Sequence, residues 1–202
     1  MPPLLGGTLC LDFVNTVDMR FSRWPEELLS TYDDLVAWGQ HAGVLDVDQA
    51  AGLLGEAAAR PGAAAAVYAW AISFRESLYQ LFRDVLAGRP PTARDLDTLN
   101  VALVTAMTEA RVLRTPGGFS WTWAERGLSL DRVLWPVARS AADLLTSPTL
   151  SRVGQCAGES GCGSLFLDTT KNRSRRWCAM RDCGNRAKAR RSSERRRSRE
   201  QS

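Results

Sequence analysis

The sequence predicts a mainly α-helical protein with one small β-hairpin (α+β), in which an N-terminal helical domain precedes a small four-cysteine module with a basic C-terminal helix. Three observations predict this fold class. Apolar residues recur at three- and four-residue spacing through much of the first 145 residues, as on one face of buried helices. β-Prone residues flank a Pro-Gly-Gly turn at 116–118. Four of the five cysteines lie between residues 156 and 183.

These patterns divide the chain into three parts. We predict a helical domain at 1–150, a cysteine-rich module at 151–191 and a basic tail at 192–202. Ser147-Pro148 ends the last helix of the domain, because a proline disfavours helical backbone at the residue before it. Whether the tail is ordered is left open by its composition, since runs of like charge are typical of solvated termini.

The domain begins with a mostly apolar stretch from Leu9 to Val17. Periodicity leaves open whether it is a buried strand or the start of a helix, and we expect Cys10 to be a core residue. Asp12 and Asn15 interrupt the stretch. We expect them to cap a helix or satisfy backbone groups, and the alternative is that they line a small-ligand pocket.

Helices are then expected wherever a capping residue begins an apolar pattern and a glycine or proline ends it. Arg75 falls inside the apolar stripe of the longest helix. We expect it to pair with an acidic side chain of the same domain, because buried arginines are seldom unpaired. The alternative partner is the carboxylate of a ligand, which would join Arg75 to Asp12 and Asn15 in one pocket. These signals predict four helices, at 31–43, 46–59, 63–87 and 92–107, and the longest of them, 63–87, is the one that contains Arg75.

A hairpin is predicted at 111–123, followed by a last core helix at 128–145. Trp121 and Trp123 stand on alternate residues and so face the same side of the hairpin. We expect both to cover the helical core, because tryptophan is usually buried to a large extent. The alternative is that they stack against nucleic-acid bases.

The cysteines of the module form two short-spaced pairs, Cys156 with Cys162 and Cys178 with Cys183. Two local pairs joined by a longer excursion are typical of a tetrahedral zinc site. Four protein thiolates leave no coordination position for water, so this spacing predicts one structural Zn²⁺ and no catalytic metal. The alternatives are four ordinary cysteines with no shared ligand, or two disulfides, which would require an oxidising compartment.

Charge is divided sharply along the chain. Residues 151–202 contain fourteen Arg or Lys against five Asp or Glu, whereas residues 1–150 contain twelve against seventeen. A basic segment on a metal-stabilised scaffold is typical of a protein that binds a polyanion, most often nucleic acid. The expected contacts come from the turn before the second cysteine pair and from the terminal helix: Arg173, Arg175, Arg176, Arg186, Lys188, Arg190, Arg191, Arg195 and Arg199.

The sequence also resembles a known family. Cys183-Gly184-Asn185-Arg186, preceded by 174–180 (SRRWCAM) and 165–168 (LFLD), is similar to the CGNR zinc finger. That module closes a family of bacterial stress-induced transcription regulators. Residues 9–16 (LCLDFVNT) resemble the motif that opens the family's N-terminal ABATE domain. The resemblance implies a zinc-bound regulator that binds DNA.

We therefore expect a cytoplasmic, non-enzymatic protein that binds double-stranded DNA through the module. The helical domain would regulate it through a small ligand, a partner or homodimerisation. One alternative is RNA or ribosome binding with Trp177 and Phe166 as stacking groups, and another is redox sensing by the zinc thiolates. An enzyme is disfavoured because no nucleophile–base pair, phosphate loop or open metal site is recognisable, and His41 is the only histidine. No apolar run is long enough to cross a membrane.

Overall fold

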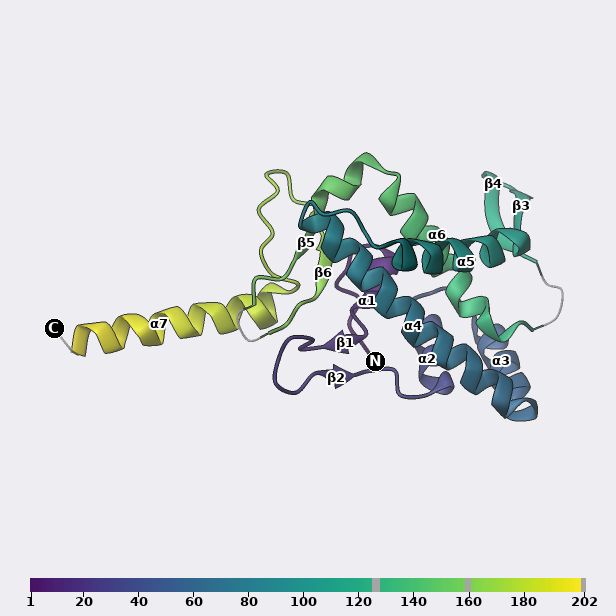
Figure 1. The fold of residues 1–202 in the computed structure, drawn as a ribbon, viewed down its shortest axis with the longest axis horizontal. Helices are drawn as coiled ribbons and strands as arrows, with labels where there is room; N and C mark the ends of the chain where they lie inside the picture. Colours follow the sequence, from purple (N-terminus) through teal and green to yellow (C-terminus); the bar gives the residue numbers. More distant parts are fainter. Residues whose placement is uncertain (125–127, 159–160, 201–202) are drawn as a thin grey trace. The chain divides into compact units, whose positions relative to one another are not determined.

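A computed structural model describes residues 1–124, 128–158 and 161–200 (Figure 1). The chain divides into two compact units. The helical unit comprises Met1 and Leu29–Ser147, and the cysteine unit comprises Pro2–Leu28 together with Pro148–Ser202. The predicted fold class is confirmed: helices predominate, the strands form small antiparallel pairs, and four cysteines cluster near the C-terminus ahead of a helix.

The described residues of the helical unit form five α-helices, and side-chain caps begin three of them. Thr31 and Asp34 form a reciprocal capping box at the first helix, Asp46 and Gln49 form another, and Thr92 accepts from the Asp95 N–H. Such caps satisfy backbone donors that a helix start leaves unpaired. The helices are α2 Tyr32–His41, α3 Val47–Ala59, α4 Pro61–Leu86, α5 Ala93–Glu109 and α6 Leu134–Leu145.

The longest helix, α4, supplies much of the core of this unit. Phe74, Leu78 and Phe82 are fully buried on it. Arg75 lies among them with only 2% of its surface exposed, and its Nε donates to Glu76 Oε1 at 2.9 Å. The prediction that an acidic side chain of this domain pairs with Arg75 is confirmed.

A 3₁₀ turn at Leu130–Val133 precedes α6, so the helix expected from residue 128 begins six residues later. Pro136 explains the difference, because it has no N–H to donate to the carbonyl of Arg132 and continue the α-helical pattern backwards. Proline is tolerated where it stands, in the first turn of α6.

The predicted hairpin is present as β3 Ala110–Thr115 and β4 Gly118–Trp123, paired in antiparallel register. Trp123 sits at the base of the hairpin and packs against Trp135, with ring centroids 5.9 Å apart. Trp121 lies further out, is 51% exposed and contacts the Arg139 guanidinium at 4.2 Å. The expectation that both tryptophans cover the core is therefore wrong for Trp121, because the hairpin extends beyond the helices that it joins.

The cysteine unit contains short elements from both ends of the chain. The sequence left open whether residues 9–17 form a strand or begin a helix. Residues 9–14 form a short, mostly buried α-helix. The elements of this unit are α1 Leu9–Val14, β1 Val17–Asp18, β2 Glu26–Glu27, a 3₁₀ turn at Pro148–Arg152, β5 Val153–Gln155, β6 Leu165–Leu167, a π-helical turn at Met180–Gly184, and α7 Asn185–Glu200. The strands pair as β1 with β2 and as β5 with β6, both antiparallel.

Buried hydrogen bonds hold the N-terminal segment to the module. Asn15 Nδ2 donates to the Leu165 carbonyl at 2.7 Å, and the Leu165 N–H donates back to Asn15 Oδ1 at 2.8 Å. The Leu167 N–H donates to the Gly6 carbonyl at 2.7 Å. A division of the chain at residue 150 alone therefore separates segments that fold together. Charge follows the units: the cysteine unit has sixteen Arg or Lys against nine Asp or Glu, and the helical unit has ten against thirteen.

Within the described ranges, none of the helices combines the length and the apolar character that crossing a membrane requires. The terminal helix α7 continues to Glu200, so most of the predicted tail at 192–202 is helical backbone. The side chains of Arg195 and Arg199 lie outside the described part of the structure.

Candidate metal centre and nucleic-acid interface

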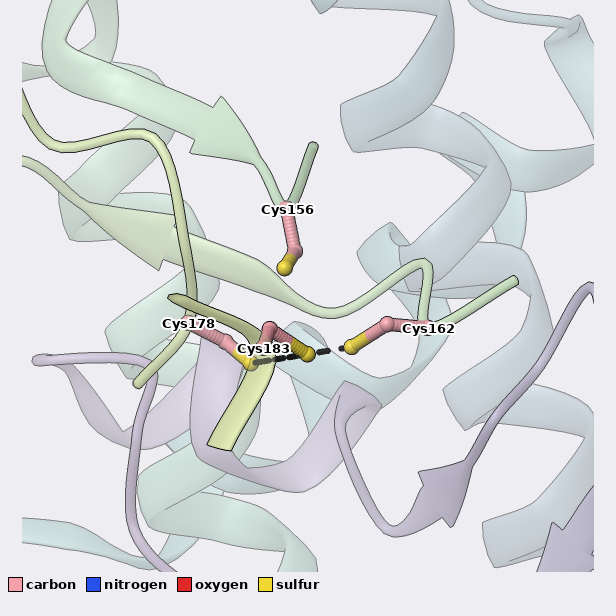
Figure 2. Close-up of side chains that lie close together, drawn as sticks. All are labelled: Cys156, Cys162, Cys178 and Cys183. Carbon is pink, nitrogen blue, oxygen red and sulfur yellow. Dashed lines mark hydrogen bonds between the residues drawn. The ribbon is translucent and has the colours of Figure 1, made fainter. Parts of the chain in front are cut away.

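The four clustered cysteines converge on one point, as Figure 2 shows. Their sulfur atoms all lie within 4.8 Å of one another, with 3.6 Å from Cys162 to Cys178 and 3.7 Å from Cys178 to Cys183. Four sulfurs bound tetrahedrally at 2.3 Å from one zinc ion would be about 3.8 Å apart. These separations exclude disulfides, which need about 2.05 Å, and all five cysteines are free.

The chemistry of the donors also fits a divalent cation. All four side chains are at most 7% exposed. Burial raises the pKa of Cys183 to about 11. Hydrogen bonds from Cys178 to Cys156 and Cys162 raise the pKa of Cys178. Bonds from Cys156 and Cys178 lower the pKa of Cys162. Four buried thiols cannot all ionise side by side unless a cation compensates them, and Zn²⁺ would do so.

Short turns position the first pair. Cys156 directly follows β5, and its N–H donates to the Ser164 carbonyl at 2.8 Å. Cys162 Sγ lies 3.1 Å from Ser164 Oγ. Gly158 passes so close to the sulfurs that a Cβ there would stand 3.2 Å from Cys183 Sγ and 3.4 Å from Cys156 Sγ. The absence of a side chain at Gly158 lets the turn close over the site.

The N-terminal segment covers this turn from outside. The N–H groups of Arg20 and Phe21 donate to the carbonyls of Cys162 and Gly161 at 3.1 and 2.8 Å. Gly161 has φ +87°, and a Cβ there would lie 2.6 Å from the backbone of Phe21 and Ser22. Only glycine meets both requirements, so the first cysteine turn is shaped to receive residues from the other end of the chain.

The Cys-Gly-Asn-Arg motif sits at the start of α7, and each residue has a distinct role. Cys183 supplies a sulfur from the π-helical turn. A Cβ at Gly184 would lie 2.5 Å from Met180 Sδ, and Asn185 Nδ2 donates to the Arg181 carbonyl at 3.0 Å. Arg186 NH2 donates to Cys183 Sγ at 3.5 Å, a bond that raises the pKa of its guanidinium. Arg186 therefore places a positive charge beside a sulfur of the cluster.

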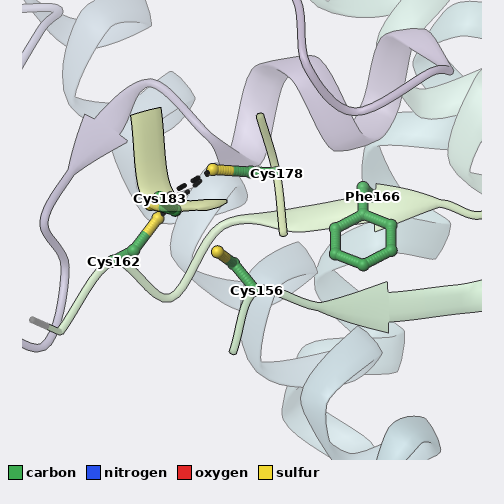
Figure 3. Close-up of a cluster of buried hydrophobic side chains, with 5 residues drawn as sticks. All are labelled: Cys156, Cys162, Phe166, Cys178 and Cys183. Carbon is green, nitrogen blue, oxygen red and sulfur yellow. Dashed lines mark hydrogen bonds between the residues drawn. The ribbon is translucent and has the colours of Figure 1, made fainter. Parts of the chain in front are cut away.

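A second arginine, Arg175, lies beside the metal centre and contacts Phe166. Phe166 of β6 is 1% exposed and belongs to the same buried cluster as the four cysteines (Figure 3). The Arg175 guanidinium lies 4.4 Å from the centre of its ring. Arg175 also donates to four backbone carbonyls, those of Leu5, Leu167, Trp177 and Cys178, at 2.6–3.2 Å.

Comparison with family models agrees with this geometry. The model described as "Putative stress-induced transcription regulator" (ABATE) matches residues 7–148, which is more than half of the chain. The chain belongs to the ABATE family. The CGNR zinc finger model matches residues 152–196 and includes all four clustered cysteines. The ABATE protein thus carries one structural zinc site, and Cys156, Cys162, Cys178 and Cys183 are the residues that would hold the ion. A search of curated proteins finds no match.

In this ABATE protein a rigid loop follows β6. Asp168, 6% exposed, accepts hydrogen bonds from the side chain and the N–H of Thr170 and from the Arg175 N–H, at 2.6–2.9 Å. The Thr170 side-chain bond is the main reason that the pKa of Asp168 is lowered. Thr170 Oγ1 also accepts from the Ser174 N–H at 2.9 Å. The loop therefore presents its outer side chains from a fixed backbone.

The predicted nucleic-acid contacts differ in how free they are. Arg175 and Arg186 are engaged at the metal centre, as described above. Arg190 Nε lies 3.3 Å from Glu194, and Arg191 donates to the Ala187 carbonyl at 3.3 Å. Among the described residues, no ion pair or hydrogen bond engages the side chains of three predicted contacts, Arg173, Arg176 and Lys188. The same holds for Lys171, Arg196 and Arg197, which were not among the predicted contacts.

The three residues of the predicted ligand pocket have structural contacts. Asp12 Oδ1 accepts from the Gly6 N–H at 2.7 Å, and Asn15 pairs with Leu165. Arg75 belongs to the helical unit and pairs with Glu76. A cavity of about 390 Å³ in the helical unit lies among α2, α3 and α4, and none of the three lines it. A ligand held by Asp12, Asn15 and Arg75 stays a prediction.

Sequence reasoning missed the residues that join the N-terminal segment to the metal centre. Gly161 and the loop Arg20–Ser22 carried no signal of their own, because their partners are about 140 residues away. Arg175 was predicted only as a nucleic-acid contact, and its hydrogen bond to the Leu5 carbonyl spans 170 residues. Asn15 did carry a signal, a polar side chain in an apolar stretch. Backbone satisfaction was the expectation favoured for it, and its partner at Leu165 is a backbone group.

Proposed function

We propose that this protein is a transcription regulator that binds double-stranded DNA through its cysteine unit. The observation that carries the proposal is the concentration of free basic side chains on the metal-stabilised unit. The loop after β6 and the exposed sides of α7 present cations from a backbone that zinc and buried hydrogen bonds hold in place. DNA phosphates attract such cations, and counterion release drives the association.

The side chains that meet phosphate are those that make no ion pair or hydrogen bond within the described part of the chain. Arg173 and Arg176 extend from the rigid loop, and Lys188, Arg196 and Arg197 extend from α7. Arg195 and Arg199 remain proposed phosphate contacts on the same helix. Arg186 is a poor candidate for reading a base edge, because its guanidinium already contacts Cys183.

A salt titration of the full-length, zinc-loaded protein tests the proposal. Anisotropy of a labelled duplex would be followed between 50 and 200 mM salt. About six phosphate contacts predict a roughly thousandfold loss of affinity over this range. Arg196→Gln and Arg197→Gln should each weaken all duplexes alike and flatten the salt slope by about one unit. Arg94→Gln, an exposed arginine on α5 of the helical unit, is the matched control and should leave binding unchanged.

The full chain is required because a fragment that begins at residue 151 lacks the segment that pairs with β6. A complete absence of duplex binding at 50 mM salt would refute the proposal, and so would an undiminished affinity in both α7 variants. A single-stranded RNA of the same sequence belongs in the same titration. Tighter binding to that RNA than to the duplex would favour the alternative that the protein binds RNA.

The burial of the sulfurs bears on the redox alternative. Cys156, Cys162, Cys178 and Cys183 are at most 7% exposed, and oxidants react fastest with accessible thiolates. This favours a structural metal over a sensor. Regulation of DNA binding by the helical unit, through a ligand, a partner or a second copy of the chain, is part of the same proposal.

A further inference from the structure

A cavity opens beside the metal centre, within the cysteine unit. Its volume is about 360 Å³, at the lower end of the range for small-molecule sites. The half-buried Trp177 and the exposed Met180 line it, together with Thr170, Ser174, Arg175, Arg176 and Cys178. It thus combines a planar aromatic wall with hydroxyl and guanidinium groups.

The polar side of this cavity is the rigid loop organised by Asp168. Arg176 lies with its guanidinium 5.3 Å from the centre of the Trp177 ring. No acidic side chain pairs with Arg176 or with the neighbouring Arg173 in the described part of the chain. The loop therefore offers uncompensated positive charge next to an aromatic surface, which is the combination that proteins use to hold a base and its phosphate.

We propose that this cavity binds one unpaired nucleobase of DNA together with its phosphate. The base stacks against Trp177 and Met180, and the phosphate is bound by Arg176 and Arg173. A paired base cannot enter, because both of its faces are covered by its neighbours in the duplex. The inference rests on the proposed function and adds to it a preference for DNA with a base outside the stack.

The test compares two labelled duplexes of about 20 base pairs, one fully paired and one with a single unpaired adenine at its centre. Both are titrated with the full-length, zinc-loaded protein. Stacking of one base predicts about tenfold tighter binding of the bulged duplex. Trp177→Ala should abolish this preference while leaving the affinity for the paired duplex unchanged, and Trp177→Phe should retain most of it.

The same unit offers a matched control pair. Arg23 lies 5.2 Å from the centre of the Trp24 ring, and Trp24 is 77% exposed. Trp24→Ala and Arg23→Ala should leave the preference intact, whereas Arg176→Ala should reduce it several-fold. If Trp177→Ala loses its zinc, the comparison of Arg176→Ala with Arg23→Ala decides, since both arginines are on the surface.

The outcomes separate the two proposals. Equal affinity of the unmodified protein for both duplexes would overturn the nucleobase site and leave duplex binding standing. A bulge preference that survives Trp177→Ala and Arg176→Ala would also overturn the site. Failure to bind either duplex would instead refute the DNA-binding proposal on which the site rests.

Discussion

In the helical unit each helix is a continuous segment with its own apolar face, whereas the cysteine unit assembles two segments that lie 119 residues apart in the chain. The helical unit is stabilised mainly by the burial of large apolar side chains such as Phe74 and Phe82. Apart from the terminal helix α7, the regular elements around the metal centre are short: strands of two or three residues and the six-residue helix α1. Such short elements need a metal ion and specific polar contacts to become a stable unit.

The two units of this chain therefore depend on different sources of stability, and different substitutions should destabilise them. A core of apolar side chains responds to lost volume, and a metal-stabilised unit responds to the loss of a single ligand or bridging group. Substitutions that target one source of stability and spare the other test whether the two units are stabilised independently.

Loss of the metal should have the largest effect. Cys162→Ser should unfold the module at 152–191 and leave the helical unit folded, because zinc binding in small domains contributes about 10–16 kcal/mol. Metal analysis should find one zinc per chain in the unmodified protein, and hydrogen exchange would locate the loss of protection. Cys10→Ala, a buried cysteine outside the cluster, should keep one zinc per chain. A protein without metal whose module is still protected would contradict the zinc assignment.

Truncation of the apolar core comes next. Phe74→Ala should lower the free energy of unfolding of the helical unit by about 3–5 kcal/mol, because it leaves a cavity beside Trp70. Thermal unfolding measures the change, and the zinc content should stay at one per chain. Val104→Ala, at a site 68% exposed on α5, is the control and should have little effect. A loss of zinc equal to that of Cys162→Ser would remove the distinction between the two units.

The bridge between the two ends of the chain should matter somewhat less. Asn15→Ala leaves the N–H and the carbonyl of Leu165 buried without a partner, at about 1–3 kcal/mol for each group. We expect a loss of roughly 2–4 kcal/mol in the cysteine unit and faster zinc release to a chelator. Asn172→Ala, on the exposed loop, should change neither. An unchanged release rate in Asn15→Ala would show that the N-terminal segment is dispensable for the module.

The smallest effect concerns the arginine of the Cys-Gly-Asn-Arg motif. Arg186→Gln should weaken zinc binding by about tenfold, because groups that hydrogen-bond to metal ligands typically contribute 10–100-fold to affinity. Competition with a chelator measures this. Lys188→Gln removes the same charge from the same helix without touching a sulfur and should leave zinc affinity unchanged. If both variants bind zinc equally, Arg186 has no role at the metal centre.

Features that depend on local patterns of residues were predictable before the fold was known. The helices follow from apolar spacing and caps such as Thr31 and Asp46, and the hairpin follows from its Pro-Gly-Gly turn. The metal site follows from two cysteine pairs, since each pair needs only a short turn to bring its sulfurs together. In each case the residues that interact are near one another in the chain.

The contacts between groups far apart in the chain became known only from the folded structure. The pairing of Asn15 with Leu165, the contact of residues 20–22 with Gly161, and the hydrogen bond from Arg175 to the Leu5 carbonyl join opposite ends of the chain. The folded structure also separated arginines engaged at the metal centre from those free to meet phosphate, which look identical in the sequence. The physical reason is that such contacts depend on the packing of whole elements, and no short-range periodicity records which backbone group a side chain will reach.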